Sequence, residues 1–369
     1  MHPWIYRSDI LETPGEEPGA VEVIDQGGRS IGMALYSPRS TIALRMLTRK
    51  ARAIDAGFWK ARIAAAIAYR ESLAPAATAY RLVHAEADGL PSFFADRFGP
   101  FVVVQFLSAG LEAYRDDLIA ALREAIAPTG ILARHDSPVR ALEGLSRDVV
   151  LLHGEVPEDV ELEENGIRYR ASPWTGQKTG AFLDQRENRA RAGELARGDA
   201  LDCFSFHGSF ALHLARAGAR VTAVDSSADA LSRASENATL NRLDAIEFVE
   251  ANVFDFLRDR EAEGRRYDVI VLDPPAFAKK RDSVDGALRG YKEINLRAMK
   301  LLAPRGHLLT FSCSWHVGRD RFRAMLEDAA ADSARPLRWI EWRGQSADHP
   351  EVVQIPESAY LKGAILQAL

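Results

Sequence analysis

The sequence predicts an α/β protein in which a doubly wound, Rossmann-like sheet at the C-terminal end follows a small β domain and an α+β domain. Three observations lead to this prediction. Short apolar stretches broken by Pro-Gly and Gly-Gly fill residues 1–50, helix and strand patterns mix over residues 51–165, and apolar strands alternate with helices over residues 166–369. Such alternation is typical of parallel sheets with helices on both faces. The 369 residues, of which 47% are hydrophobic, can fill two or three domain cores.

The first two predicted domains contain short elements. Residues 21–24 and 31–36 are expected to form antiparallel strands, because glycine-rich turns border them. The central domain is expected to contain, in order, an alanine-rich helix over residues 61–69, a hairpin around residues 87–89, a strand over residues 101–106 and a helix over residues 111–126 that Pro128 ends. This mixture indicates an α+β block.

The third predicted domain has the clearest periodicity. Strands are expected over residues 200–204, 220–224, 246–249, 267–272 and 306–311, with helices after Gly208 and over residues 227–241 and 290–302. Open α/β sheets bind their ligands at the carboxyl ends of the strands. The polar residues that end these strands are therefore the candidate site residues.

Charge is distributed unevenly along the chain. The net charge of −5 argues against a uniformly basic surface for nucleic acid. Between Arg39 and Arg70, however, eight basic residues accompany a single acid, Asp55. This run predicts either a solvated amphipathic helix face or a patch that contacts phosphates.

Cysteine content and hydropathy indicate the compartment. The two cysteines, Cys203 and Cys313, are too few for a disulfide framework, which favours a reducing environment. No apolar run reaches 18 residues, and the N-terminus lacks the layout of a signal peptide. We therefore expect a soluble cytoplasmic protein that enters no membrane, and we expect no bound metal.

Polar residues at successive strand ends predict a nucleotide-type cofactor site. Asp202 and Gly208 lie between a strand and a helix, where glycine lets the backbone approach a ligand. This segment lacks the Gly-x-Gly-x-x-Gly spacing of a dinucleotide site. Asp225, 23 residues after Asp202, ends the next strand and is either a helix cap or a ligand for both ribose hydroxyls. Asn252 follows the third strand and is expected to contact the adenine edge.

The fourth strand end adds a third acid. Asp273 begins an Asp-Pro-Pro-Ala-Phe segment directly after the apolar residues 267–272. The two prolines stop the strand and leave the carboxylate at the edge of the sheet. With Asp202 and Asp273 nearby, the ribose interpretation of Asp225 is favoured over the cap. An acidic cradle without a phosphate loop suits S-adenosylmethionine, whose sulfonium is positive, and Asp273 would hold a planar base beside it.

The chain resembles the bacterial 23S rRNA cytosine-5 methyltransferases of the large-subunit methyltransferase I type, which use S-adenosylmethionine. The matching stretches in the catalytic domain, over residues 172–366, are residues 175–186, 202–210, 273–277, 289–292, 311–314, 347–350 and 360–363. Residues 2–6 and 27–36 resemble the family's PUA RNA-binding domain, and residues 80–106 its central domain. The N-terminus begins almost at the first of these motifs, so we expect a first PUA strand to be missing or the natural start to lie upstream.

The resemblance implies a set of site residues. The cofactor would be surrounded by Lys178, Thr179, Gly180, Asp202, Phe204, Gly208, Asp225, Ser226, Asn252 and Asp273. Two positions depart from the family pattern, because Ser209 replaces the second glycine of a Thr-Gly-Gly turn and Ala276 replaces a frequent lysine. The resemblance also implies RNA as the partner, an unpaired or early assembly form of 23S rRNA. A homodimer is one oligomeric state left open.

Cytosine carbon 5 is a poor nucleophile, so methylation there requires prior attack on carbon 6, usually by a cysteine thiolate. Cys313 follows the strand over residues 306–311 in a Ser-Cys-Ser segment and is the expected nucleophile. The simpler interpretation is a buried core cysteine, which we prefer for Cys203 because of its phenylalanine neighbours. Asp273 would bind the amino and ring-nitrogen edge of the base.

Two other functions use the same scaffold. Guanine methylation at nitrogen 2 or 7 also uses an Asp-Pro-Pro edge, but nitrogen has a lone pair and needs no thiolate, so Cys313 would be passive. An RNA-binding or assembly factor with a degenerate cofactor fold is the non-enzymatic alternative, suggested by Ser209 and Ala276. The first function, cytosine-5 methylation, is the one that the motifs favour.

Overall fold

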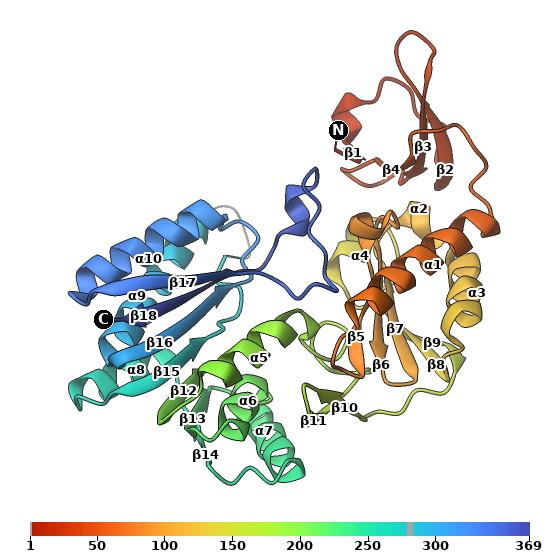
Figure 1. Cartoon of the computed structure of the whole chain (residues 1–369). Helices are drawn as coiled ribbons and strands as arrows, with labels where there is room; N and C mark the ends of the chain where they lie inside the picture. The colour runs from red at the N-terminus through yellow and green to blue at the C-terminus, as the bar shows by residue number, and fades with distance from the viewer. Residues whose placement is uncertain (1, 279–282) are drawn as a thin grey trace. The chain divides into compact units, whose positions relative to one another are not determined.

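The computed structural model describes residues 2–278 and 283–369. Contacts between residues divide the chain into two compact units (Figure 1). The first unit comprises Met1–Glu164, Ala171–Leu183 and Ala347–Ser358, and the second comprises Asn165–Arg170, Asp184–Ser346 and Ala359–Leu369. The first unit holds both segments that the sequence assigned to a β domain and an α+β domain, and those finer boundaries stay a prediction.

The first unit begins with a four-stranded antiparallel sheet. Its strands are β1 (Trp4–Ile5), β2 (Gly19–Ile24), β3 (Ser30–Tyr36) and β4 (Leu44–Thr48), in the order β1-β4-β3-β2. The predicted strands over residues 21–24 and 31–36 are confirmed as parts of β2 and β3. Strand β4 was not predicted, because Arg45 lies within it and made its sequence look like a basic surface.

A second, five-stranded sheet forms the rest of this unit. Strands β5 (Ala79–His84), β6 (Phe93–Phe98), β7 (Phe101–Phe106), β8 (Gly130–Arg134) and β9 (Val149–Gly154) lie in sequence order, and only β7 and β8 pair in parallel. Helices α1 (Ala56–Leu73) and α3 (Arg115–Ile126) lie side by side over this sheet (Figure 1). Both helices contribute to one apolar core with the strands, which confirms the α+β block.

The predicted elements of this block differ from the observed ones mainly at their ends. Helix α1 extends the predicted 61–69 in both directions, from the cap at Asp55, whose side chain accepts from the Phe58 amide. The predicted helix over residues 111–126 is instead two helices, α2 (Ala109–Glu112) and α3. Two acids in the first turn of α3 favour a new helix start there. The predicted hairpin is confirmed, with a short 3-10 turn at Ala85–Asp88 between β5 and β6.

Buried polar contacts attach two later segments to the first unit. Thr179 donates a 2.6 Å hydrogen bond to Asp96, whose carboxylate also pairs with Arg81. The Asp348 carboxylate accepts a 2.8 Å hydrogen bond from the Arg81 amide. Burying a carboxylate is costly unless it is paired in this way. These contacts explain why Ala171–Leu183 and Ala347–Ser358 belong to this unit, while the chain passes between units near β10 (Val160–Glu164) and β11 (Ile167–Ala171).

The second unit contains a seven-stranded sheet. Its strands are β12 (Asp199–Cys203), β13 (Arg220–Asp225), β14 (Ile246–Glu250), β15 (Tyr267–Leu272), β16 (Leu302–Ser312), β17 (Leu337–Arg343) and β18 (Lys362–Ala368), in the order β14-β13-β12-β15-β16-β18-β17. The first five in this order are parallel. Strand β18 is antiparallel to both neighbours, an exception to the predicted all-parallel sheet.

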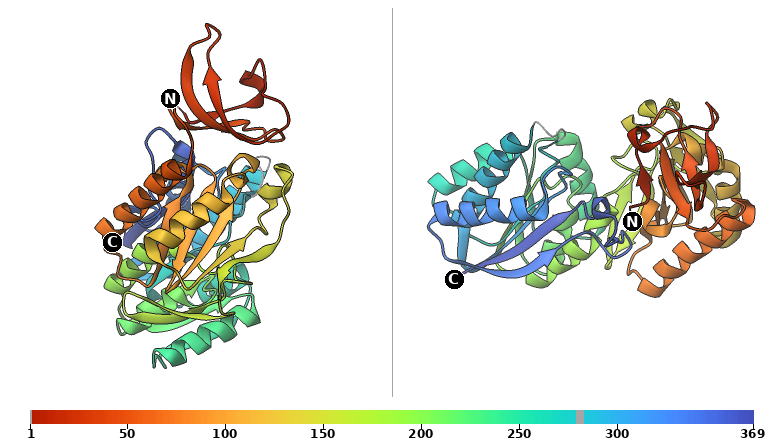
Figure 2. Two further views of the ribbon diagram at one scale, coloured as in Figure 1. Left: turned by 90° about the vertical axis from the view of Figure 1, so that its right-hand side faces the viewer. Right: turned by 90° about the horizontal axis from the view of Figure 1, so that it is seen from above.

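Helices lie on both faces of this sheet (Figures 1 and 2). They are α5 (Arg186–Leu195), α6 (Ser209–Arg216), α7 (Ala228–Leu240), α8 (Val253–Ala262), α9 (Val284–Leu301) and α10 (Arg319–Ser333). Along β15, Ile270 and Leu272 enter the core under α8, α9 and α10, whereas Val269 and Val271 enter the core under α5 and α6. Side chains of a strand alternate between faces, so both faces are buried. The predicted doubly wound fold is confirmed.

The register of the strands aligns their carboxyl ends. Cys203 lies opposite Val224 on one side and Leu272 on the other, so Asp225 and Asp273 follow at the same level. On the far side, Leu272 pairs with Thr310. The end of β16, which leads into Cys313, therefore lies at the same edge of the sheet. Among the residues that the structure describes, none of the helices combines the length and hydrophobicity needed to span a bilayer.

Candidate active site

Three predicted acids lie at one edge of the sheet in the second unit. Asp202 is 1% exposed, and its Oδ2 accepts a 2.9 Å hydrogen bond from the Ala211 amide in α6. Burial raises the pKa of Asp202 well above its ordinary value, and the charges of Asp273 and Asp225 add to this effect. The three carboxyl groups therefore lie close enough to influence one another's charge.

The turn after β12 is strained. Phe204 and Phe206 adopt positive φ angles of 63° and 49°, and Gly208 follows at 78°. Such backbone conformations cost about 1 to 3 kcal/mol each for residues other than glycine and concentrate at functional sites. At Gly208, a Cβ atom would also lie 3.0 Å from the Cβ of Ala234. Glycine is thus required where the chain enters α6, as the cofactor interpretation expects.

Asp225 is not a helix cap. Its two oxygens accept 2.9 Å hydrogen bonds from the amides of Phe206 and Ser227. The cap of α7 is Ser227, whose hydroxyl accepts from the Ala230 amide. Asp225 therefore joins the strained turn after β12 to the end of β13. The ribose contact expected of this half-buried carboxylate stays a prediction.

Two further expected cofactor ligands follow neighbouring strands. Asn252 caps α8, where its side-chain oxygen accepts a 2.9 Å hydrogen bond from the Phe254 amide. Its predicted contact with adenine therefore depends on the side-chain nitrogen. Ser226 is exposed. Both residues lie at the carboxyl ends of their strands, as predicted.

Lys178, Thr179 and Gly180 belong to the first unit. Lys178 is exposed, and its ammonium lies 4.6 Å from the centre of the Phe182 ring. The hydroxyl of Thr179 is bound to Asp96, and Gly180 has a φ of 132°. Their expected part in cofactor binding stays a prediction, whereas the other predicted residues belong to the second unit.

The second unit fits a cofactor with a positive charge. Oδ1 of Asp202 is buried and lacks a hydrogen-bond partner among the described residues. An unsatisfied carboxylate oxygen beside two other acids is costly unless a donor or a cation meets it. The sulfonium and amino groups of S-adenosylmethionine supply positive charge, and its ribose supplies donors. The geometry at Asp202, Gly208 and Asp225 therefore suits this molecule.

The two cysteines differ in their surroundings. Cys203 is fully buried, and burial raises its pKa well above the ordinary value. This finding confirms its assignment to the core beneath the turn. Cys313 is half-buried and directly follows β16. Of the two, only Cys313 has the exposure that a nucleophile requires.

The Ser-Cys-Ser segment is held from several sides. The Ser314 hydroxyl lies 2.9 Å from the Tyr291 hydroxyl of α9 and accepts a 3.2 Å hydrogen bond from the Ala278 amide. The carbonyl of Ser314 accepts a 2.7 Å hydrogen bond from the ammonium of Lys362 in β18. Tyr291 and Lys362 were not predicted as site residues, although both lie in stretches that resemble the family. These contacts fix the backbone on which Cys313 lies.

Asp273 has a partner that sequence reasoning missed. Gln185 donates a 2.8 Å hydrogen bond to Oδ1 of Asp273, and Asn188 donates a 2.6 Å hydrogen bond to the Gln185 side-chain oxygen. Gln185 and Asn188 are both almost completely buried. They fix the direction of a half-buried carboxylate. Gln185 lies in the stretch over residues 175–186 that resembles the family, and this resemblance could have identified it as a site residue.

The predicted basic patch is only partly a surface. Arg45 is buried and pairs with Glu143 at 3.0 Å. Arg70 is also buried, and it pairs with Asp88. For these two residues the prediction of a phosphate contact is wrong, because their charges are neutralised inside the first unit. The exposed members of the run are Arg39, Arg49, Lys50, Arg52 and Lys60.

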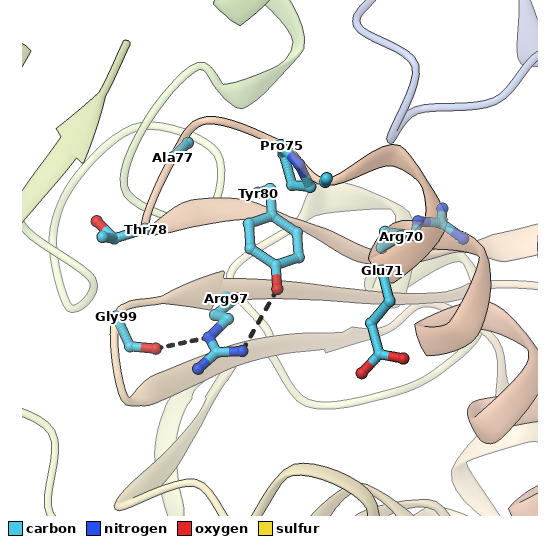
Figure 3. A pocket seen from close by; sticks show the side chains of 9 residues that line it. Arg70, Glu71, Pro75, Ala77, Thr78, Tyr80, Arg97 and Gly99 are labelled. Carbon is cyan, nitrogen blue, oxygen red and sulfur yellow. Dashed lines mark hydrogen bonds between the residues drawn. The ribbon is translucent and has the colours of Figure 1, made fainter. Parts of the chain in front are cut away.

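The first unit also contains a cavity of about 400 Å³ near the end of α1 (Figure 3). Tyr80 and Arg97 lie in its lining, and the guanidinium donates hydrogen bonds to the Tyr80 hydroxyl at 3.3 Å and to the Gly99 carbonyl at 2.8 Å. Glu71 adds a carboxylate to the same lining. An aromatic ring beside a fixed guanidinium is a pair that can contact a nucleotide.

Comparisons with known proteins identify the family. A model of S-adenosylmethionine-dependent methyltransferases matches residues 134–367, and a model of PUA-like domains matches residues 1–49. A protein of Shewanella denitrificans named ribosomal RNA large subunit methyltransferase I is 43% identical, with 99% of this chain and 94% of the relative covered. One of Tolumonas auensis with the same name is 42% identical, with 100% and 96% covered.

Solved structures agree in fold. An S-adenosylmethionine-dependent methyltransferase from Streptococcus mutans has a TM-score of 0.84 at 22% identity, with 99% of this chain and 95% of that chain covered. A methyltransferase solved in complex with SAH has a TM-score of 0.86 at the same identity and coverage. At this identity the likeness shows the fold alone, whereas the curated relatives show the family. The chain is an S-adenosylmethionine-dependent methyltransferase and belongs to the ribosomal RNA large subunit methyltransferase I family.

Proposed function

We propose that this enzyme methylates carbon 5 of a cytosine in 23S rRNA. The observation that carries the proposal is the placement of a half-buried cysteine, Cys313, at the same edge of the sheet as Asp273. Methylation of a ring nitrogen would need no thiol there. The names of the relatives support ribosomal RNA of the large subunit as the substrate, and we place the reaction in the cytoplasm.

Cys313 would act as the nucleophile. Its thiolate would form a bond to carbon 6 of the cytosine, and the electron pair of the 5,6 double bond would move to carbon 5. Carbon 5 would then carry the transferred methyl group. Water or Asp273 would take up the carbon 5 proton, and the electron pair of that C–H bond would restore the 5,6 double bond and expel the thiolate. The contacts of Ser314 support this role, because they hold the backbone next to Cys313 at a fixed place after the end of β16.

Asp273 would recognise the base. A carboxylate can accept from the exocyclic amino group of cytosine and share a proton with the adjacent ring nitrogen, which makes carbon 6 more electrophilic. Gln185 supports this role, because its hydrogen bond to Oδ1 of Asp273 fixes the orientation of the carboxylate. When bound, S-adenosylmethionine supplies an electrophilic methyl group, and Asp202, Gly208 and Asp225 would hold it.

RNA would contact two kinds of side chain, aromatic ones that stack on bases and basic ones that contact phosphates. Trp315, two residues after Cys313, is 52% exposed and would stack on a nucleotide that flanks the target. The exposed residues Arg49 and Arg52 would contact phosphates, and Tyr80 with Arg97 would offer a second stacking place. Because the target base must leave its stack, an unpaired segment is the expected substrate.

Two measurements test the proposal. Mass spectrometry of rRNA nucleosides from cells with and without the gene should find 5-methylcytosine that depends on it. RNA that carries 5-fluorocytosine at the target cannot lose the carbon 5 substituent as a proton, so a covalent protein–RNA adduct should accumulate. Cys313→Ser should abolish the adduct and leave cofactor binding intact, whereas Cys203→Ala should keep the adduct. A methylguanosine product, or 5-methylcytosine at the normal rate from Cys313→Ala, would contradict the proposal.

A further inference from the structure

We propose that Lys362 is a positioning residue that takes up the thiol proton of Cys313 and holds the resulting thiolate as an ion pair. The inference deepens the proposed function, because it explains how Cys313 becomes nucleophilic at neutral pH. The proton leaves Sγ of Cys313 and joins Nζ of Lys362, so a neutral thiol and a neutral amine become a thiolate and an ammonium. No other reactant is required.

Lys362 lies inside the sheet rather than on its surface. It begins β18, which is inserted between β16 and β17, and it pairs with Ser312, the residue before Cys313. The residue is only 4% exposed. Lysine is almost never buried to this extent without a partner for its charge. Its position beside the Ser-Cys-Ser segment therefore calls for a counter-ion.

The side-chain nitrogen of Lys362 has two hydrogen bonds within the described part of the chain, which the two hydrogens of a neutral amine can make, and its lone pair can then take up the thiol proton. Nζ donates to the Ser314 carbonyl at 2.7 Å and to the Tyr360 carbonyl at 2.9 Å. Both acceptors are neutral, so neither compensates the charge. An ammonium has three hydrogens to donate. The two carbonyls hold Nζ beside the backbone of Cys313, where a thiolate would be both the third acceptor and the counter-ion.

Gly363 makes this placement possible. It pairs with Phe311 across the β16–β18 ladder, and a Cβ atom at this position would lie 2.4 Å from Cδ1 of the Phe311 ring. A distance below 3 Å is not tolerated, so with any other residue here the Phe311 ring would have to move. The close approach seats Lys362 against the end of β16.

The amine of Lys362 can exchange a proton close to neutral pH. Burial lowers the pKa of Lys362 to about 8, and the neighbouring Cys313 acts in the opposite direction by raising it. A free cysteine has a pKa of about 8.5, so a thiol with this ordinary pKa could pass its proton to such an amine at little cost in free energy. Other titratable groups nearby are already engaged, because Tyr291 contacts Ser314 and Arg343, opposite Gly363 on β17, binds Asn188 and Glu341.

The test measures the thiol itself, without RNA or methyl transfer. The full-length protein, carrying Cys203→Ala so that one thiol remains, is alkylated with iodoacetamide between pH 5.5 and 10, and mass spectrometry of the Cys313 peptide follows the rate. We expect a midpoint at least one pH unit below 8.5, the value of a free thiol. A midpoint at or above 8.5 would overturn the inference, and this result requires no change at Lys362.

Variants separate charge from packing. Lys362→Met should raise the midpoint and slow alkylation at pH 7 by at least tenfold, whereas Lys362→Arg should keep most of the shift because it retains a cation. Lys300→Met, which removes a half-exposed lysine paired with Glu261, is the matched control and should change nothing. An unchanged midpoint in Lys362→Met would also overturn the inference. If the product is methylguanosine while the low midpoint is found, the proposed cytosine chemistry fails and the ion pair stands.

Discussion

Gln185 donates a 2.8 Å hydrogen bond to Oδ1 of Asp273, and so links the start of α5 to the Asp-Pro-Pro segment after β15. A hydrogen bond to a charged group contributes about 1.5 to 3 kcal/mol. We expect Gln185→Leu to lower kcat about tenfold or more, because the carboxylate loses its orientation toward the base. Single-turnover methylation assays measure this, and cofactor affinity should stay within about twofold.

The control for this prediction is another glutamine of the same unit. Gln367 binds the Arg305 carbonyl at the opposite end of β16, so Gln367→Leu should leave kcat unchanged. A Gln185→Leu enzyme with the normal kcat would show that Asp273 is oriented without Gln185.

Asp225→Ala should weaken the binding of S-adenosylmethionine at least tenfold. The change removes the charge-assisted contacts that we propose with the ribose, and it also frees the amides of Phe206 and Ser227 that the carboxylate now binds. Calorimetry with the protein and its variant measures the affinity. Asp229→Ala, at an exposed position in the first turn of α7, is the control and should bind normally. Equal affinity of Asp225→Ala and the unchanged protein would exclude Asp225 as the ribose ligand.

Gly208→Ala should lower the free energy of unfolding by more than Gly218→Ala does. Both glycines have positive φ angles, 78° and 97°, so each alanine carries a backbone cost of about 1 to 2 kcal/mol. Only at Gly208 does the new methyl group collide with Ala234, since no atom lies within 4 Å at Gly218. Urea unfolding measures both changes. Cofactor affinity should fall only in Gly208→Ala. Equal losses of unfolding free energy in the two variants would mean that the turn accommodates the methyl group at Gly208 without cost.

The exposed and buried arginines of the basic run should respond differently. Arg49→Ala and Arg52→Ala should each reduce the slope of log affinity for RNA against log salt by about one unit, with no effect on stability. Arg45→Ala should instead lower the free energy of unfolding by about 3 to 5 kcal/mol, because Glu143 is left buried without its cation. Filter binding at several salt concentrations and thermal melting measure the two effects. An unchanged salt slope in the Arg49 and Arg52 variants would reduce the run to an ordinary solvated surface.

Acidic pH should destabilise the first unit through His84. Burial, with the nearby charge of Arg81, lowers the pKa of His84 well below its ordinary value. The unfolded chain then binds more protons than the folded chain below about pH 6.5, so stability falls as the pH drops through that value. Melting temperatures at pH 7.5 and 5.5 should differ less in His84→Asn than in the unchanged protein. As a control, His316→Asn, at an exposed position, should leave the difference in melting temperature between pH 7.5 and 5.5 unchanged.

The wound sheet could be predicted because its parallel strands are buried on both faces and so form continuous apolar runs. The carboxyl ends of those runs are sufficient to predict that Asp202, Asp225 and Asp273 lie at one edge of the sheet. Strands β17 and β18 escaped prediction because the insertion of β18 between β16 and β17 depends on contacts between distant segments. The sequence of β17 also carries charged residues among apolar ones, so local periodicity does not distinguish it from a loop.

The residues that support the site were harder to find. Lysine and glutamine usually lie on the surface of a protein. Only the burial of Lys362 and Gln185 beside Ser314 and Asp273 shows that they support the site. Arg45 was misassigned for the opposite reason, since its partner Glu143 lies 98 residues away in the sequence. A run of charges is counted along the sequence, whereas the residue that neutralises a charge can come from a distant part of the sequence.

The division into units has a consequence for how the gene can change. The chain passes from one unit to the other after residues 164, 170, 183, 346 and 358. A fragment that ends at residue 165 would lack both Thr179 and Asp348, and would leave Asp96 and Arg81 without those partners. No single cut or fusion point therefore yields either unit whole. One crossover therefore cannot exchange the whole first unit for that of another protein without also dividing the second.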